Sequence, residues 1–219
     1  MEKIVPQCKD PRVSPVLLSS FYLAPVQYYA ALFHAGKAWM EIHDSYQKQS
    51  YRNRCIIGGA NGPMTLSIPI EKQASPNALT RDARVSDHGN WRHLHWNAIL
   101  SAYNSTPFFQ YYEDDFRPFY ENKHRFLHDF NEELRALICR LIEIETPVSY
   151  TAAYTPKPET GIIDLREAIH PKRPTGFEAP PYYQVFAEKQ GFVPNLSIID
   201  LLFNLGNEAR LYLNSCMAY

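Results

Sequence analysis

The sequence predicts a single α/β domain with a Rossmann-like mixed sheet, covering helices and a Pro-rich C-terminal extension. Two apolar segments of strand length, 16–20 and 38–42, flank a helical segment at 24–35, which is the order of a right-handed βαβ unit with a parallel strand pair. The chain has 219 residues, 45% hydrophobic and 21% charged, which is enough for one sizeable core. We therefore expect one domain over residues 1–219, with a polar leader at 1–14.

The first predicted helix carries the usual start and stop signals. Pro25 lies in its first turn, and Gly36 follows its last residue. In open α/β sheets, ligands bind at the carboxyl ends of the strands. We therefore expect residues 19–22 and 43–46, which follow the two strands, to lie at one ligand-binding edge.

The next region predicts a hairpin. A polar segment at 46–54 leads into two strand-like runs, 55–57 and 64–70, which are separated by the turn residues of 58–63, including Asn-Gly. Residues 83–86 are apolar enough for a further strand. The glycines of the turn lack the other residues of a dinucleotide-binding or phosphate-binding loop, so we interpret them as turn residues only.

The middle of the chain predicts helices that cover the sheet. Apolar residues recur at three- and four-residue spacing from residue 91 to 106, and 107–122 and 124–144 are also amphipathic. Residues 146–181 are rich in proline and are expected to be an extended connection, with a short ordered piece at 162–166.

The C-terminal part predicts a short apolar helix at 197–205 that ends at Gly206, followed by a closing segment at 209–213.

Charge and composition exclude several classes of protein. A formal net charge of -1 argues against binding to a nucleic-acid polymer, which favours a basic surface. No run approaches the roughly 20 apolar residues that span a bilayer, and we expect no membrane span. The four cysteines contain no C-x-x-C pair, so we expect free thiols and a cytoplasmic location. The sequence identifies no cofactor and leaves the oligomeric state open.

The chemically densest stretch is residues 87–96, which contains His88, His93 and His95 between two tryptophans. A helix that begins near residue 90 places Trp91 and His95 on one face and His93 on another, so three imidazoles cannot converge on a metal. One or two histidines are candidates for general acid and base, or for donors to a phosphate at the helix N-terminus.

A structural interpretation of the same stretch is equally open. Asp87 or Asn90 would then cap the helix, and the tryptophans would belong to the core.

A second candidate is the segment Tyr51-Arg52-Asn53-Arg54. Two guanidinium groups and an amide suit a phosphate if the chain is extended and the arginines share a face. The alternative is a solvated polar loop, which is the commoner role of an isolated R-x-R. Glu113-Asp114-Asp115 is more typical of an exposed acidic helix face than of a cation site, and we predict no metal ligand. No G-x-S-x-G or H-E-x-x-H motif supports a hydrolase or zinc protease.

A series of motifs in order carries a resemblance to a known family. They are Tyr22-Leu23 with Pro25 and Tyr28-Tyr29, Tyr51 to Arg54, Asn61-Gly62-Pro63, Leu66-Ser67-Ile68-Pro69, Trp91 with His95, Ala102-Tyr103, Pro107-Phe108-Phe109, Tyr182-Tyr183-Gln184 and residues 192–204. Together they resemble the WbqC-like family over nearly the whole chain after the leader. Many members of that family lie in gene clusters for O-antigen and other surface polysaccharides.

The resemblance implies a transferase that acts on an activated or phosphorylated sugar, with a sugar or nucleotide sugar as its small-molecule ligand. The expected site residues are His95 and His88 for catalysis, and Tyr22, Arg52, Asn53, Arg54 and Trp91 for binding phosphate or substrate. The family usually has His-Gln-Pro before the tyrosine, whereas this chain has Ser19-Ser20-Phe21, so no catalytic role transfers to those positions.

The alternative function is a non-catalytic protein of a polysaccharide assembly system. It would bind a glycan or a partner through the aromatic residues of 107–120 and the Pro-rich loop 171–181.

Overall fold

A four-stranded parallel sheet lies at the centre of the computed structural model, which describes residues 14–72, 75 and 78–216. The strand order is β5 (Val148–Tyr150), β2 (Ala38–Glu41), β1 (Val16–Ser19) and β6 (Ile163–Asp164). Strands β1 and β2 pair in parallel, with Ser19 opposite Glu41, which confirms the predicted βαβ unit and the α/β class.

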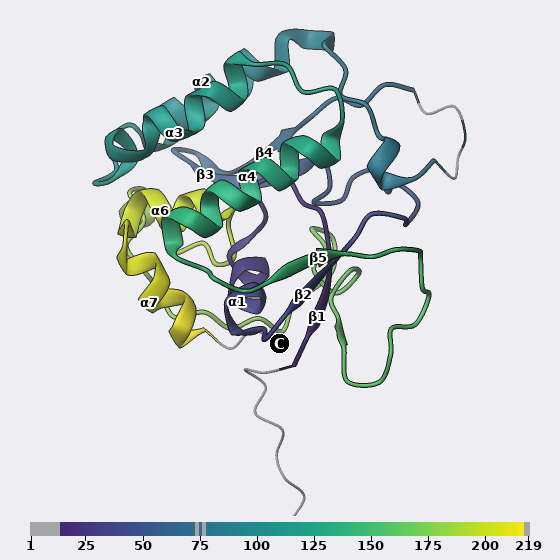
Figure 1. The fold of residues 1–219 in the computed structure, drawn as a ribbon. Helices are drawn as coiled ribbons and strands as arrows, with labels where there is room; N and C mark the ends of the chain where they lie inside the picture. Colours follow the sequence, from purple (N-terminus) through teal and green to yellow (C-terminus); the bar gives the residue numbers. More distant parts are fainter. Residues whose placement is uncertain (1–13, 73–74, 76–77, 217–219) are drawn as a thin grey trace, which may run out of the picture.

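The crossover helix of that unit is α1 (Val26–His34), and it is buried along most of its length. It packs against the C-terminal helices α6 (Ile198–Leu205) and α7 (Glu208–Ser215), which lie beside it in Figure 1. The two ends of the described chain therefore share one core.

The predicted hairpin is present as β3 (Arg54–Gly59) and β4 (Gly62–Ser67), an antiparallel pair that forms its own two-stranded sheet. The strands extend into the expected turn, because Gly58 pairs with Pro63 and Gly59 with Gly62. Strand β4 ends before Pro69, which has no N–H for a ladder. The mixed character of the fold therefore comes from two separate sheets.

The further strand predicted at 83–86 is wrong. Arg84 and Val85 form only isolated bridges, to Phe126 on one side and Ile70 on the other. The backbone here links the end of the hairpin to the start of helix α4, because Val85 N–H donates to Arg125 and Glu71 N–H donates to Arg84.

Three helices form the middle of the chain, as predicted: α2 (Trp91–Tyr103), α3 (Phe109–Glu121) and α4 (Leu127–Ile142). Helix α2 packs against α3 and strand β3, and α3 packs against α4 and α6, so these helices lie over the hairpin as well as the main core (Figure 1). Two short 3-10 turns (Thr80–Asp82 and His88–Asn90) and helix α5 (Ala187–Gln190) complete the elements of the described ranges.

The glycine after α6 ends that helix, as predicted. Gly206 has a φ of +56°, and a Cβ there would lie 2.6 Å from the Phe108 ring. A larger residue would therefore be strained by its backbone and would collide with the ring of Phe108.

The helix caps expected for α2 are wrong. Asn90 stands at the cap position in the left-handed region, but its side chain makes no capping hydrogen bond. The carboxylate of Asp87 pairs instead with Arg92 at 2.7 Å and with Lys123 at 2.7 Å. The chain enters this helix through the 3-10 turn at His88–Asn90, which holds Asp87 away from the first helical N–H groups.

The Pro-rich connection contributes more to the sheet than expected. The ordered piece predicted at 162–166 contains β6, but the preceding three-residue strand β5 was not predicted. Such a short strand after Pro147 has no periodicity to reveal it. Residues 1–13 of the predicted leader at 1–14 lie outside the described residues. Within the described ranges, no helix combines the length and apolar character required to cross a bilayer.

Candidate functional site

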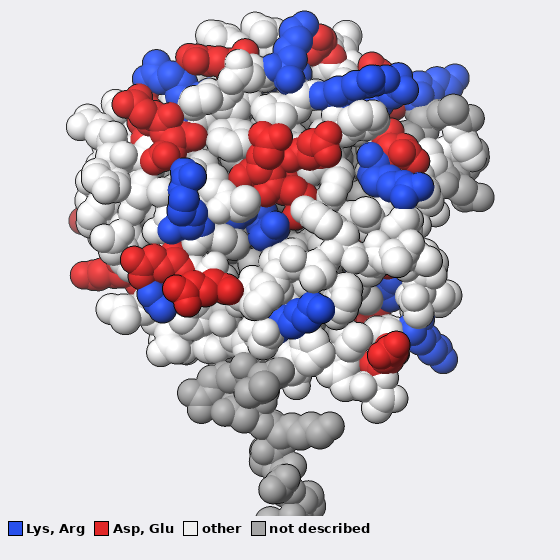
Figure 2. Space-filling view, in the orientation of Figure 1, with Lys and Arg blue, Asp and Glu red and all other residues white. Residues whose placement is uncertain are grey.

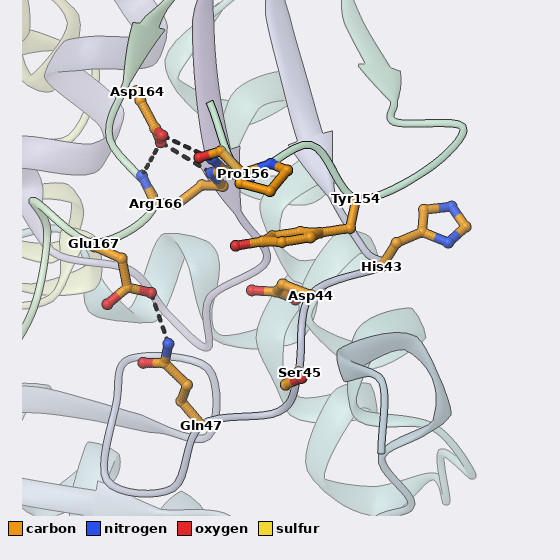
Figure 3. A pocket seen from close by; sticks show the side chains of 9 residues that line it. All are labelled: His43, Asp44, Ser45, Gln47, Tyr154, Pro156, Asp164, Arg166 and Glu167. Atoms are coloured by element: carbon orange, nitrogen blue, oxygen red, sulfur yellow. Dashed lines mark hydrogen bonds and ion pairs between the residues drawn. The ribbon is translucent and has the colours of Figure 1, made fainter. Parts of the chain in front are cut away.

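A cavity of about 280 Å³ opens beside the carboxyl ends of β2 and β6, and we call it the rim cavity. Its walls come from the segment after β2, the crossover between β5 and β6, and the end of β6 (Figure 3). The lining residues are His43, Asp44, Ser45, Gln47, Tyr154, Pro156, Asp164, Arg166 and Glu167. This is the edge at which parallel sheets bind ligands. Of residues 43–46, which were expected there, 43–45 line the rim cavity, whereas Tyr46 lines a second cavity.

Arg166 ties the strand ends together and has no free donor. Its Nε and Nη2 donate to the two carboxylate oxygens of Asp164 at 2.9 and 2.7 Å, and Nη1 donates to Glu41 at 3.2 Å. The remaining N–H groups donate to the carbonyls of Thr155 at 3.0 Å and Pro156 at 3.2 Å. All five guanidinium donors are therefore occupied, and Arg166 shapes the cavity rather than holding a ligand.

The carboxylate partners of Arg166 are also held in place by hydrogen bonds. Glu41 is fully buried, and its other oxygen accepts from His43 N–H at 2.8 Å and from the Thr151 hydroxyl at 2.9 Å. Burial raises the pKa of Asp164, but the hydrogen bonds from Arg166 outweigh it and hold that pKa below its ordinary value. These contacts link β2, β6 and the residue after β5 into one rigid wall.

Arg52 does not line the cavity but contacts two residues that do. Its side chain is 1% exposed, and Nη2 donates to Asp44 and, at 3.1 Å, to the Ser19 hydroxyl at the end of β1. Glu167 lies 3.6 Å from the same nitrogen, and Gln47 donates to Glu167 at 2.8 Å. Arg52 therefore positions two carboxylates of the rim cavity.

His43 has no free nitrogen at this edge. Its Nε2 lies 3.0 Å from the carbonyl of Thr151, which can only accept, and its Nδ1 lies 3.2 Å from Nη1 of Arg81, which can only donate. The hydrogen bonds therefore assign the proton to Nε2. The imidazole points away from the centre of the cavity in Figure 3 and serves as part of its wall.

The groups that face the open space are Tyr154, Asp44 and Glu167. In Figure 3 the hydroxyl of Tyr154 and the carboxylate of Asp44 both point to the side of the cavity on which Glu167 lies. Tyr154 is 51% exposed, while Asp44 is buried and its Oδ1 has no partner among the described residues. An aromatic face beside carboxylate acceptors suits a hydroxyl-rich ligand such as a sugar. In the part of the chain that the structure describes, no group of three or more His, Cys, Asp or Glu is arranged to hold a metal ion.

The predicted catalytic residue His95 lies in the core and not at the rim cavity. It is 5% exposed, its Nδ1 lies 3.0 Å from the Tyr22 hydroxyl, and its ring contacts Trp91 edge-on at 5.0 Å. Burial lowers the pKa of His95 from 6.5 to about 4, although a hydrogen bond to the backbone of Ser67 opposes that shift. At neutral pH the imidazole is therefore uncharged, inside what we call the His95 cluster of Tyr22, Trp91, His95 and Tyr120.

The rest of the His95 cluster is equally enclosed. Tyr22 is fully buried, and its hydroxyl lies 2.8 Å from that of Tyr120. Burial raises the pKa of Tyr22 well above its ordinary value, and the neighbouring Tyr120 and Cys55 raise it further. Trp91 donates to the carbonyl of Ser86 at 3.0 Å. The expected helical face shared by Trp91 and His95 is confirmed, and it faces the core.

The other predicted residues are divided between two more places. His88 is exposed on the 3-10 turn before α2. Asn53 and Arg54 line a second cavity, together with residues on either side of Pro69. The structure therefore does not bring Arg52, Arg54 and His95 to one cavity.

Sequence reasoning missed most of the rim cavity. Glu41 and Asp164 end two strands, and their acidic character at these positions was an available signal once parallel pairing of β6 was known. Tyr154 and Arg166 lie in the Pro-rich connection, where no periodicity placed them beside β2.

The molecular surface carries charges of both signs. On the face shown in Figure 2, acidic side chains gather near the middle, where α4 runs, and basic side chains surround them. This face has no continuous basic surface of the kind that binds a nucleic-acid polymer.

Comparison with known proteins gives one family and one curated relative. The relative is an uncharacterised protein of Mycobacterium tuberculosis, Rv1507c, which is 29% identical over 196 residues, covering 78% of this chain and 84% of its own. No solved structure matches. The model of the WbqC-like protein family matches residues 20–173 and 175–212, which include every residue that lines the rim cavity. The chain belongs to the WbqC-like protein family.

Proposed function

We propose that this protein is a transferase that acts on an activated or phosphorylated sugar in the biosynthesis of a surface polysaccharide, and that the sugar binds in the rim cavity. The observation that carries the proposal is the meeting of Tyr154, Asp44 and Glu167 in one cavity at the carboxyl edge of the sheet. Carboxylates accept hydrogen bonds from sugar hydroxyls, and a tyrosine ring offers an apolar face to a sugar ring. The resemblance of the sequence to a family linked with polysaccharide gene clusters supports the substrate class.

The carboxylates of the rim cavity are held in place and can accept a proton. Asp44 is held by Arg52, and Glu167 by Gln47, so neither carboxylate has to reorganise when a ligand arrives. The side chain of Glu167 is 43% exposed and can be reached by an acceptor substrate.

In the proposed reaction, the acceptor oxygen forms a bond to the transferred group while the bond from that group to phosphate breaks. The phosphate-bearing product leaves with the electron pair, and the acceptor proton passes to Glu167. A base role for His95 or His88 stays a prediction. Glu167 is the better candidate because it lines the cavity.

The proposal is tested with a panel of nucleotide sugars and sugar phosphates. Purified full-length protein is mixed with each compound at about millimolar concentration, and the melting temperature is measured. At least one compound is expected to raise it, because a ligand that binds only the folded state stabilises that state. Glu167→Gln and Asp44→Asn are expected to reduce the shift. If no compound stabilises the wild-type protein, the proposal is rejected.

A second candidate function is non-catalytic binding of a glycan or partner protein. Exposed aromatic side chains favour it: Tyr111 is 77% exposed and Tyr183 is 57% exposed. Under this alternative, Tyr111→Ser would abolish capture of the glycan or partner from the assembly system. Glu167→Gln would leave the capture intact, and no turnover of any sugar donor would be detected.

A further inference from the structure

A second cavity, of about 560 Å³, lies on the other side of the segment that lines the rim cavity, and we call it the basic cavity. It is built where the polar segment after residue 45 meets the start of β3 and the residues that follow β4. The residues that line it are Tyr46, Lys48, Gln49, Asn53, Arg54, Ser67, Ile68, Pro69, Ile70, Glu71 and Lys72.

The charge of the basic cavity is opposite in character to that of the rim cavity. Lys48, Arg54 and Lys72 provide three cations against the single carboxylate of Glu71, a net charge of +2. At the rim cavity, by contrast, both arginines contact carboxylates. An excess of positive charge along the walls of a cavity favours an anionic ligand.

The cationic groups of the basic cavity are also unpaired. The described residues form 13 ion pairs, and none of these pairs includes Lys48, Arg54 or Lys72. Nε of Arg54 is buried without a hydrogen-bond partner. A buried guanidinium N–H that lacks an acceptor costs free energy, and an arriving anion would remove that cost.

Neutral groups complete the lining. Burial raises the pKa of Tyr46 to about 12, although Arg52 and Arg54 oppose the shift, so its hydroxyl keeps the proton and can donate. Asn53 fixes the wall, because its Nδ2 donates to the carbonyl of Ile68 at 2.9 Å. The backbone N–H of Ile68 is already bonded to Asn53, so the side chains supply the available donors.

We propose that the basic cavity binds the phosphate or diphosphate group of a small molecule, through Arg54, Lys48 and Lys72. The identity of that molecule as an activated sugar rests on the proposed function, whereas the binding of the anion does not. Tyr46 and Lys48 alternate along the chain with the rim residues Ser45 and Gln47, so one segment serves both cavities. The sugar and phosphate parts of one substrate would then contact opposite sides of this segment.

The test is calorimetric titration of inorganic pyrophosphate into the full-length protein in metal-free buffer at low salt. Wild-type protein is expected to bind, and Arg54→Gln and Lys48→Gln are each expected to weaken binding by about tenfold, since each removes a charge-assisted contact. Binding should also weaken as salt is added. Arg140→Gln is the matched control, because that arginine is 71% exposed and does not line the cavity.

Two results would overturn the inference: no binding of pyrophosphate by the wild-type protein, or equal affinity in wild type and Arg54→Gln. Circular dichroism of each variant shows whether it is folded. Glu167→Gln separates this inference from the proposed function. It should bind pyrophosphate as wild type does but show a smaller thermal shift with nucleotide sugars. If pyrophosphate binds at Arg54 and no sugar compound ever does, the anion site stands and the proposed function fails.

Discussion

The His95 cluster and the rim cavity both concentrate polar side chains, yet they differ in charge and in access to solvent. The cluster consists of neutral groups with aromatic neighbours, and burial lowers the pKa of His95 to about 4. The rim cavity contains charged groups that neutralise one another and open to solvent through Tyr154 and Glu167.

The difference shows why chemical density in a sequence is a poor guide to a site. The stretch 87–96 contains three histidines. Its buried residues, Trp91 and His95, pack in the core, and the side chain of Asn90 does not cap helix α2. The rim cavity takes its residues from two regions far apart in the sequence, 43–47 and 154–167, so nothing in the sequence marks it as one site. Charges that are paired and still reachable are a better indication of function than uncharged groups in a core.

The largest effect is expected from Arg166→Met. This substitution leaves Glu41 fully buried without its cation, and removal of one partner of a buried pair costs about 3–5 kcal/mol of unfolding free energy. Denaturant titration measures the loss. Arg140→Met, on the surface, is the control and should change stability by less than about 0.5 kcal/mol. A small effect of Arg166→Met would mean that the wall of the rim cavity does not depend on this network.

The next effect concerns pH and the His95 cluster. The pKa of His95 is 6.5 when exposed and about 4 in the folded protein, so the unfolded chain binds the proton more tightly. The contribution of the neutral imidazole is therefore complete above pH 6.5 and is lost as pH falls from 6.5 to about 4, which amounts to about 3 kcal/mol. His95→Gln should remove this part of the pH dependence, measured by denaturant titration at a series of pH values. Parallel curves for the two proteins would show that His95 is not held neutral by burial.

A smaller effect is expected from Tyr22→Phe. The substitution keeps the ring contacts but removes the hydroxyl that bonds both His95 and Tyr120. Two buried groups lose a partner, so the free energy of unfolding should fall by about 1–2 kcal/mol. Tyr183→Phe, with an exposed ring, is the control and should leave stability unchanged. If Tyr22→Phe lowers turnover of a sugar donor without lowering stability, the cluster belongs to the catalytic site after all.

The smallest effect is expected from His88→Ala. His88 is exposed, and among the described residues its one hydrogen bond is from its backbone N–H to the hydroxyl of Ser86 at 3.1 Å. The melting temperature and the response to nucleotide sugars should both match those of the wild type. A loss of turnover with unchanged stability would restore the expectation that His88 is the catalytic base.

The sequence predicts the parts of the fold that depend on local patterns. The βαβ unit, the hairpin, the three middle helices and the stop at Gly206 all follow from periodicity and from proline and glycine positions. The strand predicted at 83–86 fails because its partners come from two different segments. Strand β5 is too short for a pattern, since its formation depends on pairing with β2.

The site is harder to predict, because it depends on which strands become neighbours. Residues 43–45 were correctly expected at the ligand edge, and Arg52 lies next to it. Tyr46 and Tyr22 were expected there too, but Tyr46 lines the basic cavity and Tyr22 lies in the core. Sequence spacing could not show that Arg52 forms an ion pair with Asp44, whereas Arg54, two residues later, lines a different cavity. Tertiary pairing decides which of two similar arginines is free.

The most direct test of the account is the affinity of Tyr154→Ala for the nucleotide sugar or sugar phosphate that most stabilises the wild type. Tyr154 lies over the rim cavity and is half-exposed, so its loss should raise Kd by about tenfold while the protein stays folded. Tyr183→Ala, an exposed tyrosine elsewhere, is the matched control and should bind as the wild type does. An unchanged Kd for Tyr154→Ala, together with a loss of binding in His95→Gln, would contradict the account and return the substrate to the His95 cluster.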